Sequence, residues 1–206
     1  MPQIFYCDAK KFEHLYEEIL LLLPEKRREK AEKFFKKEDK LLSAISALLV
    51  IKAFGKEAFE CMNFGEHGKP FFEYGECFSI SHSGRIAMLA VSKEDIGIDV
   101  ECRKTANEKI AERCFTEEEQ AFSKTSTEAF FRIWTAKEAV LKILGTGFSY
   151  SPKNFSVLPL DEEHRICGKD MRFYCGNIEE FPFTAAYSEK DDNFVIREVL
   201  PEELIY

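Results

Sequence analysis

The sequence lacks the patterns that mark several common protein classes. None of its seven cysteines forms a CxxC pair, and none of its four histidines stands at zinc-ligand spacing, so neither a zinc finger nor a disulfide framework is indicated. The longest apolar run near the N-terminus covers only residues 19–23, whereas a membrane-spanning helix needs about 20 apolar residues. We therefore expect reduced thiols in a cytoplasmic protein that does not bind a membrane.

An excess of positive charge is also missing. The chain has 29 Lys and Arg against 37 Asp and Glu, a formal net charge of −8, which argues against a protein whose whole surface binds nucleic acid. An anionic ligand would have to meet a local basic patch. Residues 26–40 form such a patch, with eight basic residues against four acidic ones. Charged runs on helices are usually solvated, so the patch alone does not establish a binding site.

The hydrophobic pattern changes twice from a helical to a strand-like period. The 206 residues, 45% of them hydrophobic, suffice for a sizeable core. The helical patterns cover residues 10–23, 25–35, 38–54, 107–114, a stretch from 117, and 128–144. The strand-like runs cover residues 3–7, 77–81, 86–92, 96–101, 155–158, 171–175, 183–187 and 194–199. We expect an α+β fold with two similar halves, residues 1–95 and 96–206.

Local sequence signals also predict helix ends in the second half. Thr116 with Glu119, and Thr125 with Glu128, have the spacing of a capping box, in which side chains satisfy the first free N–H groups of a helix. Gly145 suits the C-terminal cap of the long helix, because glycine adopts the left-handed conformation that such a cap requires.

Two carboxylates stand close together on one candidate strand. Residues 96–101 alternate strictly, so Asp99 and Glu101 point to the same face with their Cβ atoms about 6–7 Å apart. This separation lets both side chains reach one hard cation such as Mg²⁺. The ordinary alternative is a solvated strand face, and only a third carboxylate would favour the metal site.

The helix at residues 128–144 offers that third carboxylate. With Trp134 set at zero and about 100° per residue, Lys137, Glu138 and Lys142 fall at about −60°, +40° and +80°. An ordinary amphipathic helix keeps its charges opposite its large apolar side chains, whereas here they share a face. An ion pair between Glu138 and Lys142 is one explanation. A half-buried charged site against the core is the other.

Two further segments carry groups suited to phosphate. Residues 79–84 are rich in hydroxyls and include His82, and these groups can donate hydrogen bonds to phosphate oxygens. A serine nucleophile is not indicated, because the GxSxG pattern fails at Ser83, where Arg85 stands in place of the second glycine. Residues 68–70, Gly-Lys-Pro, form no Walker loop. Ordinary turn chemistry would also explain both segments.

Five motifs in order resemble a known family. They are Gly68-Lys69-Pro70, residues 79–83, residues 97–101, residues 115–119, and the run from Trp134 to Lys142. Across residues 24–158 the sequence is similar to the 4′-phosphopantetheinyl transferases of the surfactin-synthetase-activating type. The resemblance implies two α+β halves related by a pseudo-twofold axis, with coenzyme A and Mg²⁺ in the cleft between them.

The resemblance also implies roles for individual residues. It makes Asp99, Glu101 and Glu138 the metal ligands and places Lys137 and Lys142 near the diphosphate of coenzyme A. Glu119 matches an acidic position that is a direct or a water-mediated metal partner in different members. The residues implied around the 3′-phosphoadenosine are Lys26 or Arg27, Lys30, Lys69, Pro70, Ser81 and His82.

The implied reaction is a phosphoryl transfer. A serine hydroxyl of an acyl or peptidyl carrier protein attacks the β-phosphorus of coenzyme A and releases 3′,5′-ADP. Lys142 offsets charge on the leaving phosphate, and Glu138 is the expected base for the serine proton. A monomer is expected, because two fused halves complete the cleft. The alternatives are a Mg²⁺-dependent nucleotide phosphohydrolase and a carrier-binding protein without turnover.

Overall fold

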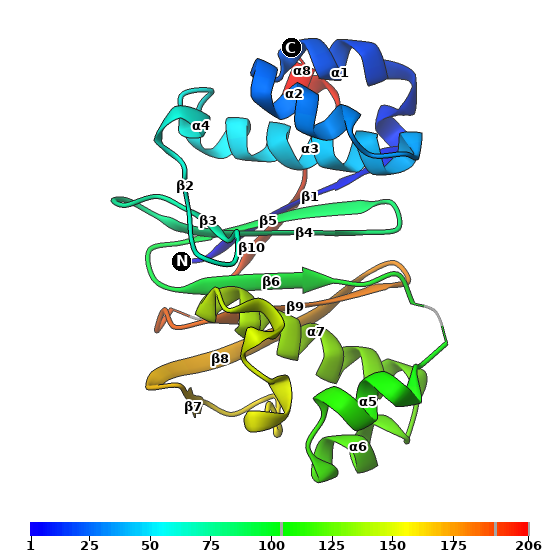
Figure 1. Ribbon diagram of the computed structural model, residues 1–206, viewed down its shortest axis with the longest axis vertical. Coiled ribbons are helices and arrows are strands. Elements are labelled where there is room, and N and C mark those ends of the chain that lie inside the picture. Colours follow the sequence, from blue (N-terminus) through cyan, green and yellow to red (C-terminus); the bar gives the residue numbers. More distant parts are fainter. Residues whose placement is uncertain (104, 192, 206) are drawn as a thin grey trace.

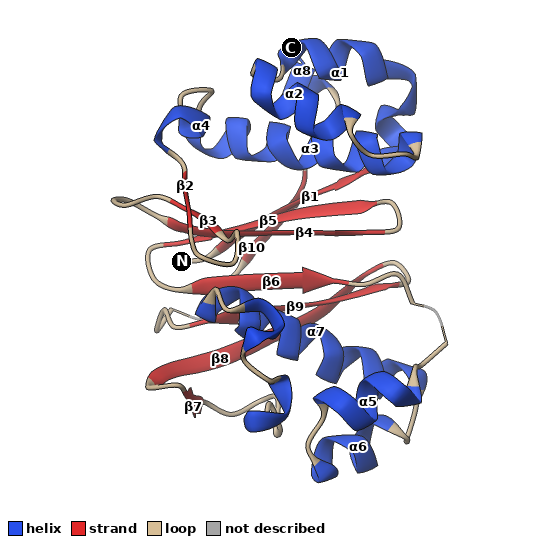
Figure 2. Cartoon of the chain, in the orientation of Figure 1, coloured by secondary structure: helices blue, strands red, loops and turns tan. Residues whose placement is uncertain are grey.

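Two four-stranded sheets lie between two groups of helices in the computed structural model, which describes residues 1–103, 105–191 and 193–205. The helices lie at the two ends of the molecule, and the strands occupy its middle (Figures 1 and 2). No helix within these ranges combines the length and the apolar character needed to cross a bilayer. The architecture confirms the predicted α+β class.

The first sheet has the strand order β10-β1-β5-β4. Its strands are β1 (Gln3–Asp8), β4 (Cys77–Ser83), β5 (Ile86–Ser92) and β10 (Val195–Glu198), with a separate short pair β2 (Asn63–Phe64) and β3 (Pro70–Phe71). The helical segments of this half are η1 (Ala9–Leu15), α1 (Tyr16–Leu22), α2 (Glu25–Glu32), α3 (Lys37–Phe54) and α4 (Ala58–Cys61). Every residue of α3 from Leu41 to Val50 is buried, so this helix forms the centre of the first core.

The second sheet has the strand order β6-β9-β8-β7. Its strands are β6 (Ile96–Val100), β7 (His164–Ile166), β8 (Lys169–Ile178) and β9 (Phe181–Tyr187). The helical segments are α5 (Glu108–Cys114), α6 (Glu117–Ser123), α7 (Thr127–Leu144), η2 (Gly147–Ser149) and η3 (Pro152–Asn154). Helix α7 packs on β6 and β9. A Cβ atom on Gly97 would lie 2.0 Å from the carbonyl oxygen of Ala139, so only glycine permits this close approach of β6 to α7.

The end of the chain returns to the first half. β10 pairs in parallel with β1, and Val199 is fully buried in the first core. Helix α8 (Glu202–Ile205) packs beside α1 and α3 (Figure 1). The last segment of the expected second half, residues 96–206, therefore packs with the first half. This happens because the edge of β1 that faces away from β5 pairs with β10.

The predicted strand at residues 155–158 is wrong. The structure has no strand there, although Phe155 and Val157 are buried as a strand pattern requires. The carbonyl oxygen of Phe155 accepts a hydrogen bond from Lys137 Nζ, and the Val157 N–H donates to Glu119 Oε1 at 2.8 Å. Buried side chains thus take the place of a neighbouring strand.

Two of the three predicted caps are confirmed. Thr116 and Glu119 form a capping box at α6, and Gly145 ends α7 in the left-handed conformation. The prediction for Thr125 is wrong, because the Ala129 N–H donates to the hydroxyl of Ser126 at 3.0 Å. The Thr125 hydroxyl instead donates to the Phe122 carbonyl at 2.7 Å.

A buried ion pair connects α6 to α7. Lys137 Nζ lies 2.7 Å from Glu119 Oε2, and both side chains are 0% exposed. Lys137 also donates to the carbonyl of Pro152 at 2.8 Å. Burial lowers the pKa of Lys137, while the hydrogen bond and charge of Glu119 act in the opposite direction. Lys137, expected near a diphosphate, is therefore enclosed in the second core and does not reach the groove.

We predict a large loss of stability for Lys137→Met, because it leaves the Glu119 carboxylate buried without its countercharge. Removal of one partner of a buried pair costs about 3–5 kcal/mol, measured here as the free energy of unfolding in urea. Lys142→Met is the control, since the Lys142 side chain is 27% exposed and its loss leaves a smaller penalty. Equal stability of the two variants would contradict the structural role of Lys137.

Candidate active site

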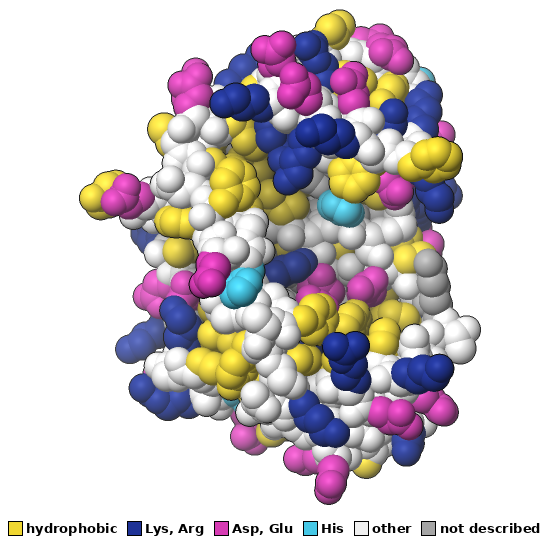
Figure 3. All heavy atoms as spheres, viewed as in Figure 1, with side chains coloured by type: hydrophobic (Ala, Val, Ile, Leu, Met, Phe, Trp, Pro, Cys, Tyr) yellow, Lys and Arg dark blue, Asp and Glu magenta, His cyan; other side chains and the backbone are white. Residues whose placement is uncertain are grey.

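A groove runs along the junction of the two halves. One pocket, of about 250 Å³, is lined by Lys69, Glu138 and Lys142, and a second, of about 210 Å³, is lined by Arg27, Lys30 and His82. Both pockets share Gly68, Pro70 and Ile80, so they adjoin each other, and together we call them the groove. Figure 3 shows a hollow across the middle of this face in which basic, acidic and histidine side chains gather.

Serine side chains of β4 join the two sheets beneath the groove. β4 and β6 are the facing edges of their sheets, and no backbone ladder joins them within the described ranges. The hydroxyls of Ser79, Ser81 and Ser83 instead accept the N–H groups of residues 98, 100 and 102 at 3.1, 3.3 and 2.9 Å. We call this set of three bonds the serine seam. It satisfies the outward N–H groups of β6 and that of Cys102 just beyond the strand, and it fixes the position of β6 against the first half.

Asp99 lies on β6 directly above the serine seam. Its Oδ1 accepts hydrogen bonds from the Ser81 hydroxyl at 2.9 Å and from Lys142 Nζ at 2.8 Å. Its Oδ2 is buried and has no hydrogen-bond donor within the described ranges. Asp99 is thus held on one side and leaves one oxygen available to a ligand.

Glu101 follows β6 and is held from both halves of the molecule. Its Oε1 accepts a hydrogen bond from Trp134 Nε1 at 2.9 Å, and its Oε2 accepts one from the Ser83 hydroxyl at 3.0 Å. Burial raises the pKa of Glu101, and the negative charge of Asp99 raises it further. Both hydrogen bonds and the charge of Lys142 oppose this rise. The two hydrogen bonds therefore fix the orientation of the carboxylate, while burial removes part of its hydration.

Glu138 on α7 completes the acidic group. Burial raises the pKa of Glu138 from 4.5 to about 7, and the charges of Asp99 and Glu101 add to the rise. Its carboxylate accepts no hydrogen bond from the part of the chain that the structure describes. Each of these facts indicates a carboxylate that gains from a positive ligand or a proton.

The three carboxylates suit a hard divalent cation by their chemistry. The charge of Asp99 raises the pKa of both Glu101 and Glu138, the charge of Glu101 adds to the rise at Glu138, and one buried oxygen of Asp99 has no hydrogen-bond partner in the described ranges. Oxygen donors of this kind are preferred by Mg²⁺. No three His, Cys, Asp or Glu side chains in the described ranges already converge closely enough to enclose a metal. The donor set therefore fits the charge and type of the ion, while the structure does not show a formed site.

Positive charge gathers at the other end of the groove. Burial lowers the pKa of Arg27, whose Nε is a buried donor without an acceptor in the described ranges, and its guanidinium lies 5.2 Å from the ring centre of Phe59. Burial lowers the pKa of Lys30 by removing hydration, and the positive charge of Arg27 lowers it further. The pKa of His82 is also lowered, first by lost hydration and then by Lys142. These groups would be stabilised by an anion.

The remaining predicted residues lie in different places. Lys69 Nζ donates to the Ile143 carbonyl at 3.1 Å, so it caps the end of α7 beside Lys142 and away from Arg27. Pro70 lines both pockets. Lys26 is exposed on α2 and lines neither pocket, which leaves Arg27 as the member of that pair inside the groove.

Sequence reasoning missed two residues that hold the carboxylates. Ser83 and Trp134 bond Glu101, and Ser81, expected at a phosphate, bonds Asp99 instead. The signal was available, because alternate residues of a strand share one side and residues four apart on a helix share one face. Neither pattern shows by itself that the hydroxyls and the indole would point at carboxylates.

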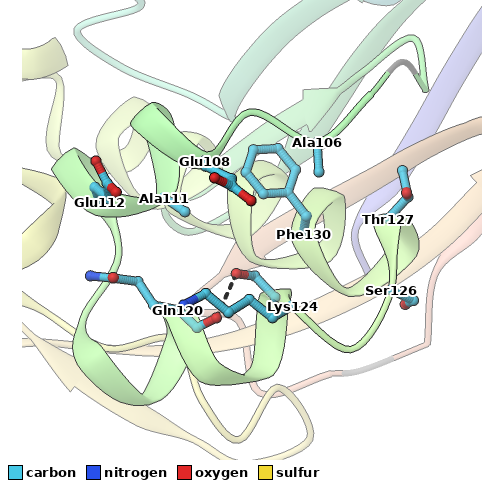
Figure 4. Close-up of a pocket in the computed structure, with 10 residues that line it drawn as sticks. Ala106, Glu108, Ala111, Glu112, Gln120, Lys124, Ser126, Thr127 and Phe130 are labelled. Atoms are coloured by element: carbon cyan, nitrogen blue, oxygen red, sulfur yellow. Dashed lines mark hydrogen bonds between the residues drawn. The ribbon is translucent and has the colours of Figure 1, made fainter.

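A larger pocket lies among α5, α6 and the start of α7. It has a volume of about 340 Å³, and Glu108, Gln120, Lys124 and Phe130 are among its lining residues (Figure 4). None of the acidic or basic residues of the groove lines it. We therefore assign the candidate site to the groove, which several of the predicted site residues line, rather than to the larger space.

The raised pKa of Glu138 predicts a specific pH dependence of stability. Between pH 4.5 and about 7 the folded protein holds a proton that the unfolded chain releases, so Glu138 lowers stability as the pH rises. Glu138→Gln should gain stability relative to wild type between about pH 5 and about pH 8, measured by urea unfolding in EDTA. The exposed Glu128→Gln on the same helix is the control. The prediction would be contradicted if the difference in unfolding free energy between Glu138→Gln and wild type did not change with pH.

Comparisons with known proteins agree with this geometry. The sequence pattern of the 4′-phosphopantetheinyl transferase superfamily matches residues 95–196. A 4′-phosphopantetheinyl transferase of Bacillus subtilis is 34% identical over 151 residues, which are 67% of each chain. The transferase ffp of Bacillus subtilis is 30% identical over 78% of this chain and 77% of its own. The transferase Sfp of Bacillus subtilis strain 168 is 29% identical over 74% and 73%, respectively. On these matches, the chain belongs to the 4′-phosphopantetheinyl transferase superfamily.

Proposed function

We propose that this protein transfers the 4′-phosphopantetheine arm of coenzyme A to a serine hydroxyl of an apo acyl or peptidyl carrier protein. The observation that carries the proposal is the groove itself, in which Arg27, Lys30 and His82 lie at one end and Glu138 and Lys142 lie at the other, with Asp99 and Glu101 beside them. Such a groove suits a ligand whose phosphates are separated along its length. Membership of the superfamily supports the same reaction.

The basic end is proposed to bind the 3′-phosphate. The buried Nε of Arg27 lacks an acceptor in the described ranges, and a phosphate oxygen would supply one. Lys30 and His82 line the same pocket and can add charge or a hydrogen bond. Lys142 and Lys69 line the neighbouring pocket, where the diphosphate would lie.

Asp99, Glu101 and Glu138 are proposed to hold one Mg²⁺. When bound, the ion supplies positive charge against the diphosphate and the developing charge of the leaving group. Lys142 already lies 2.8 Å from Asp99 Oδ1 and so adds a second positive charge at the same place. Ser81 and Ser83 keep the two carboxylates of β6 in position.

The chemical step is proposed as an in-line displacement. The carrier serine oxygen bonds to the β-phosphorus of coenzyme A, the bond from that phosphorus to the bridging oxygen breaks, and 3′,5′-ADP leaves with this oxygen. Glu138 lines the groove and is proposed to accept the serine proton. Lys142 stabilises the charge on the departing phosphate. The protein needs no covalent intermediate for this step.

We place this reaction in the cytoplasm and assign it to a monomer. All seven cysteines are free thiols in the structure, as suits a reducing compartment. Both ends of the groove come from one chain, so a second copy is not required to complete the site.

The reaction is tested by the mass of an apo carrier protein after incubation with this protein, coenzyme A and Mg²⁺. We expect a gain of one phosphopantetheine, its loss in EDTA, and a rate at least about 100-fold lower for Asp99→Asn, which removes a charge from the metal-binding group. Release of 3′,5′-ADP without a change in carrier mass would indicate a phosphohydrolase. An unchanged mass for several acyl and peptidyl carriers, without release of 3′,5′-ADP, would leave only carrier binding.

The assignment of the 3′-phosphate predicts different effects on two ligands. Arg27→Gln should weaken the binding of coenzyme A by at least about tenfold, because a charged hydrogen bond contributes about 1.5–3 kcal/mol, and should leave dephospho-coenzyme A nearly unaffected. Lys26→Gln, a change of equal charge on the exposed side of α2, is the matched control. Calorimetric titrations that give equal losses for both ligands would contradict the assignment.

A further inference from the structure

Two side chains from opposite halves of the molecule donate hydrogen bonds to the Glu101 carboxylate. Ser83 at the end of β4 donates to Oε2 at 3.0 Å, and Trp134 on α7 donates to Oε1 at 2.9 Å. Within the described ranges, Glu101 is the one residue of the acidic group with hydrogen bonds to both oxygens. We propose that Ser83 and Trp134 are positioning residues that orient Glu101 and thereby set the affinity of the groove for a divalent cation. The proposal rests on the metal site of the proposed function.

Glu101 needs such support because its own backbone provides little. β6 ends at Val100, and Glu101 continues beyond it with one backbone bond, from its N–H to the Pro182 carbonyl at 2.9 Å. A free glutamate side chain loses about 1.5–2 kcal/mol of rotamer entropy when it is fixed in one orientation. Two hydrogen bonds to the ionised carboxylate hold it in that orientation before a cation arrives.

The two donors are themselves rigid. The Ser83 hydroxyl also accepts the Cys102 N–H at 2.9 Å as the last bond of the serine seam, so its donor direction is set. Trp134 lies one turn before Glu138 on α7, and its ring stacks with Phe148 at 6.1 Å between ring centres and an angle of 20°. The indole therefore ties the orientation of Glu101 to the helix that presents Glu138.

Ser79 provides a matched comparison within the same seam. Its hydroxyl accepts the Ile98 N–H at 3.1 Å, as Ser83 accepts that of Cys102, but it makes no bond to a carboxylate of the described chain. Ser79→Ala removes one seam bond alone. Ser83→Ala removes one seam bond together with the hydrogen bond to Glu101. The difference between these variants isolates the positioning role.

The experiment measures Mn²⁺ binding by the electron paramagnetic resonance signal of free Mn²⁺, with and without saturating coenzyme A. Removal of a hydrogen bond that supports a metal ligand typically lowers metal affinity by about 10–100-fold, so Ser83→Ala and Trp134→Phe should each weaken Mn²⁺ binding by at least about tenfold. Ser83→Thr, which keeps the hydroxyl, should restore it. Ser79→Ala should lower the melting temperature as Ser83→Ala does and leave the Mn²⁺ affinity unchanged.

A second readout comes from the indole itself. Trp134 is the only tryptophan in the sequence, so quenching of its fluorescence by Mn²⁺ reports on this site alone. The quenching midpoint should rise about tenfold in Ser83→Ala and stay unchanged in Ser79→Ala. Binding of coenzyme A in EDTA is measured in both variants as well, because Ser79 lines the pocket proposed for the diphosphate and a loss of that ligand must be kept apart from a loss of Mn²⁺ affinity.

The possible outcomes separate this inference from the proposed function. Wild-type Mn²⁺ affinity in Ser83→Ala and Trp134→Phe overturns the positioning role even if carrier modification proceeds. An equal loss in Ser79→Ala and Ser83→Ala also overturns it, because the seam alone would then explain the effect. Failure of the wild-type protein to modify any carrier overturns the proposed function, whatever its affinity for Mn²⁺.

Discussion

The site depends on how two sheet edges meet without a backbone ladder. β4 and β6 lie side by side (Figure 1), and the hydroxyls of Ser79, Ser81 and Ser83 accept the outward N–H groups of β6 and of the segment that follows it. A hydroxyl accepts one hydrogen bond and still donates another. Two of these serines use that second bond on Asp99 and Glu101. The contact that joins the halves therefore also orients the carboxylates, so the groove cannot form correctly unless the halves dock in register.

Helix α7 shows how neighbouring residues on one helix serve different purposes. Lys137 points into the second core and pairs with Glu119, whereas Glu138 and Lys142 line the groove. Successive residues are about 100° apart around a helix, which separates the two directions. Gly97 allows the helix to lie against β6, so Glu138 lies close enough to Asp99 and Glu101 for their charges to shift its pKa. The position of the third carboxylate thus depends on a residue without a side chain.

Periodicity alone predicted most of the fold and part of the site. The long helices α3 and α7, the strands β5 and β6, and the cap at Gly145 follow from local patterns, because burial of one face and helix termination are local properties. The carboxylates Asp99, Glu101 and Glu138 were found in the same way. The pairing of Lys137 with Glu119 and the return of β10 to β1 depend on contacts between distant segments. No period along the sequence contains that information, and the expectation that Lys137 lies near a diphosphate came from the family resemblance.

In the proposed function, the separation of charge along the groove lets an acidic chain select a polyanion. Arg27, Lys30 and His82 are proposed to bind phosphate at one end, but Asp99, Glu101 and Glu138 would repel a diphosphate at the other. Lys142 offsets only part of this repulsion, since its ammonium is already paired with Asp99 at 2.8 Å. An anion that occupies both ends must therefore arrive with additional positive charge. By thermodynamic linkage, a cation at the carboxylates and a diphosphate ligand each raise the affinity for the other. A ligand with phosphate at the basic end alone gains nothing from the cation, so the acidic end distinguishes ligands that carry both groups.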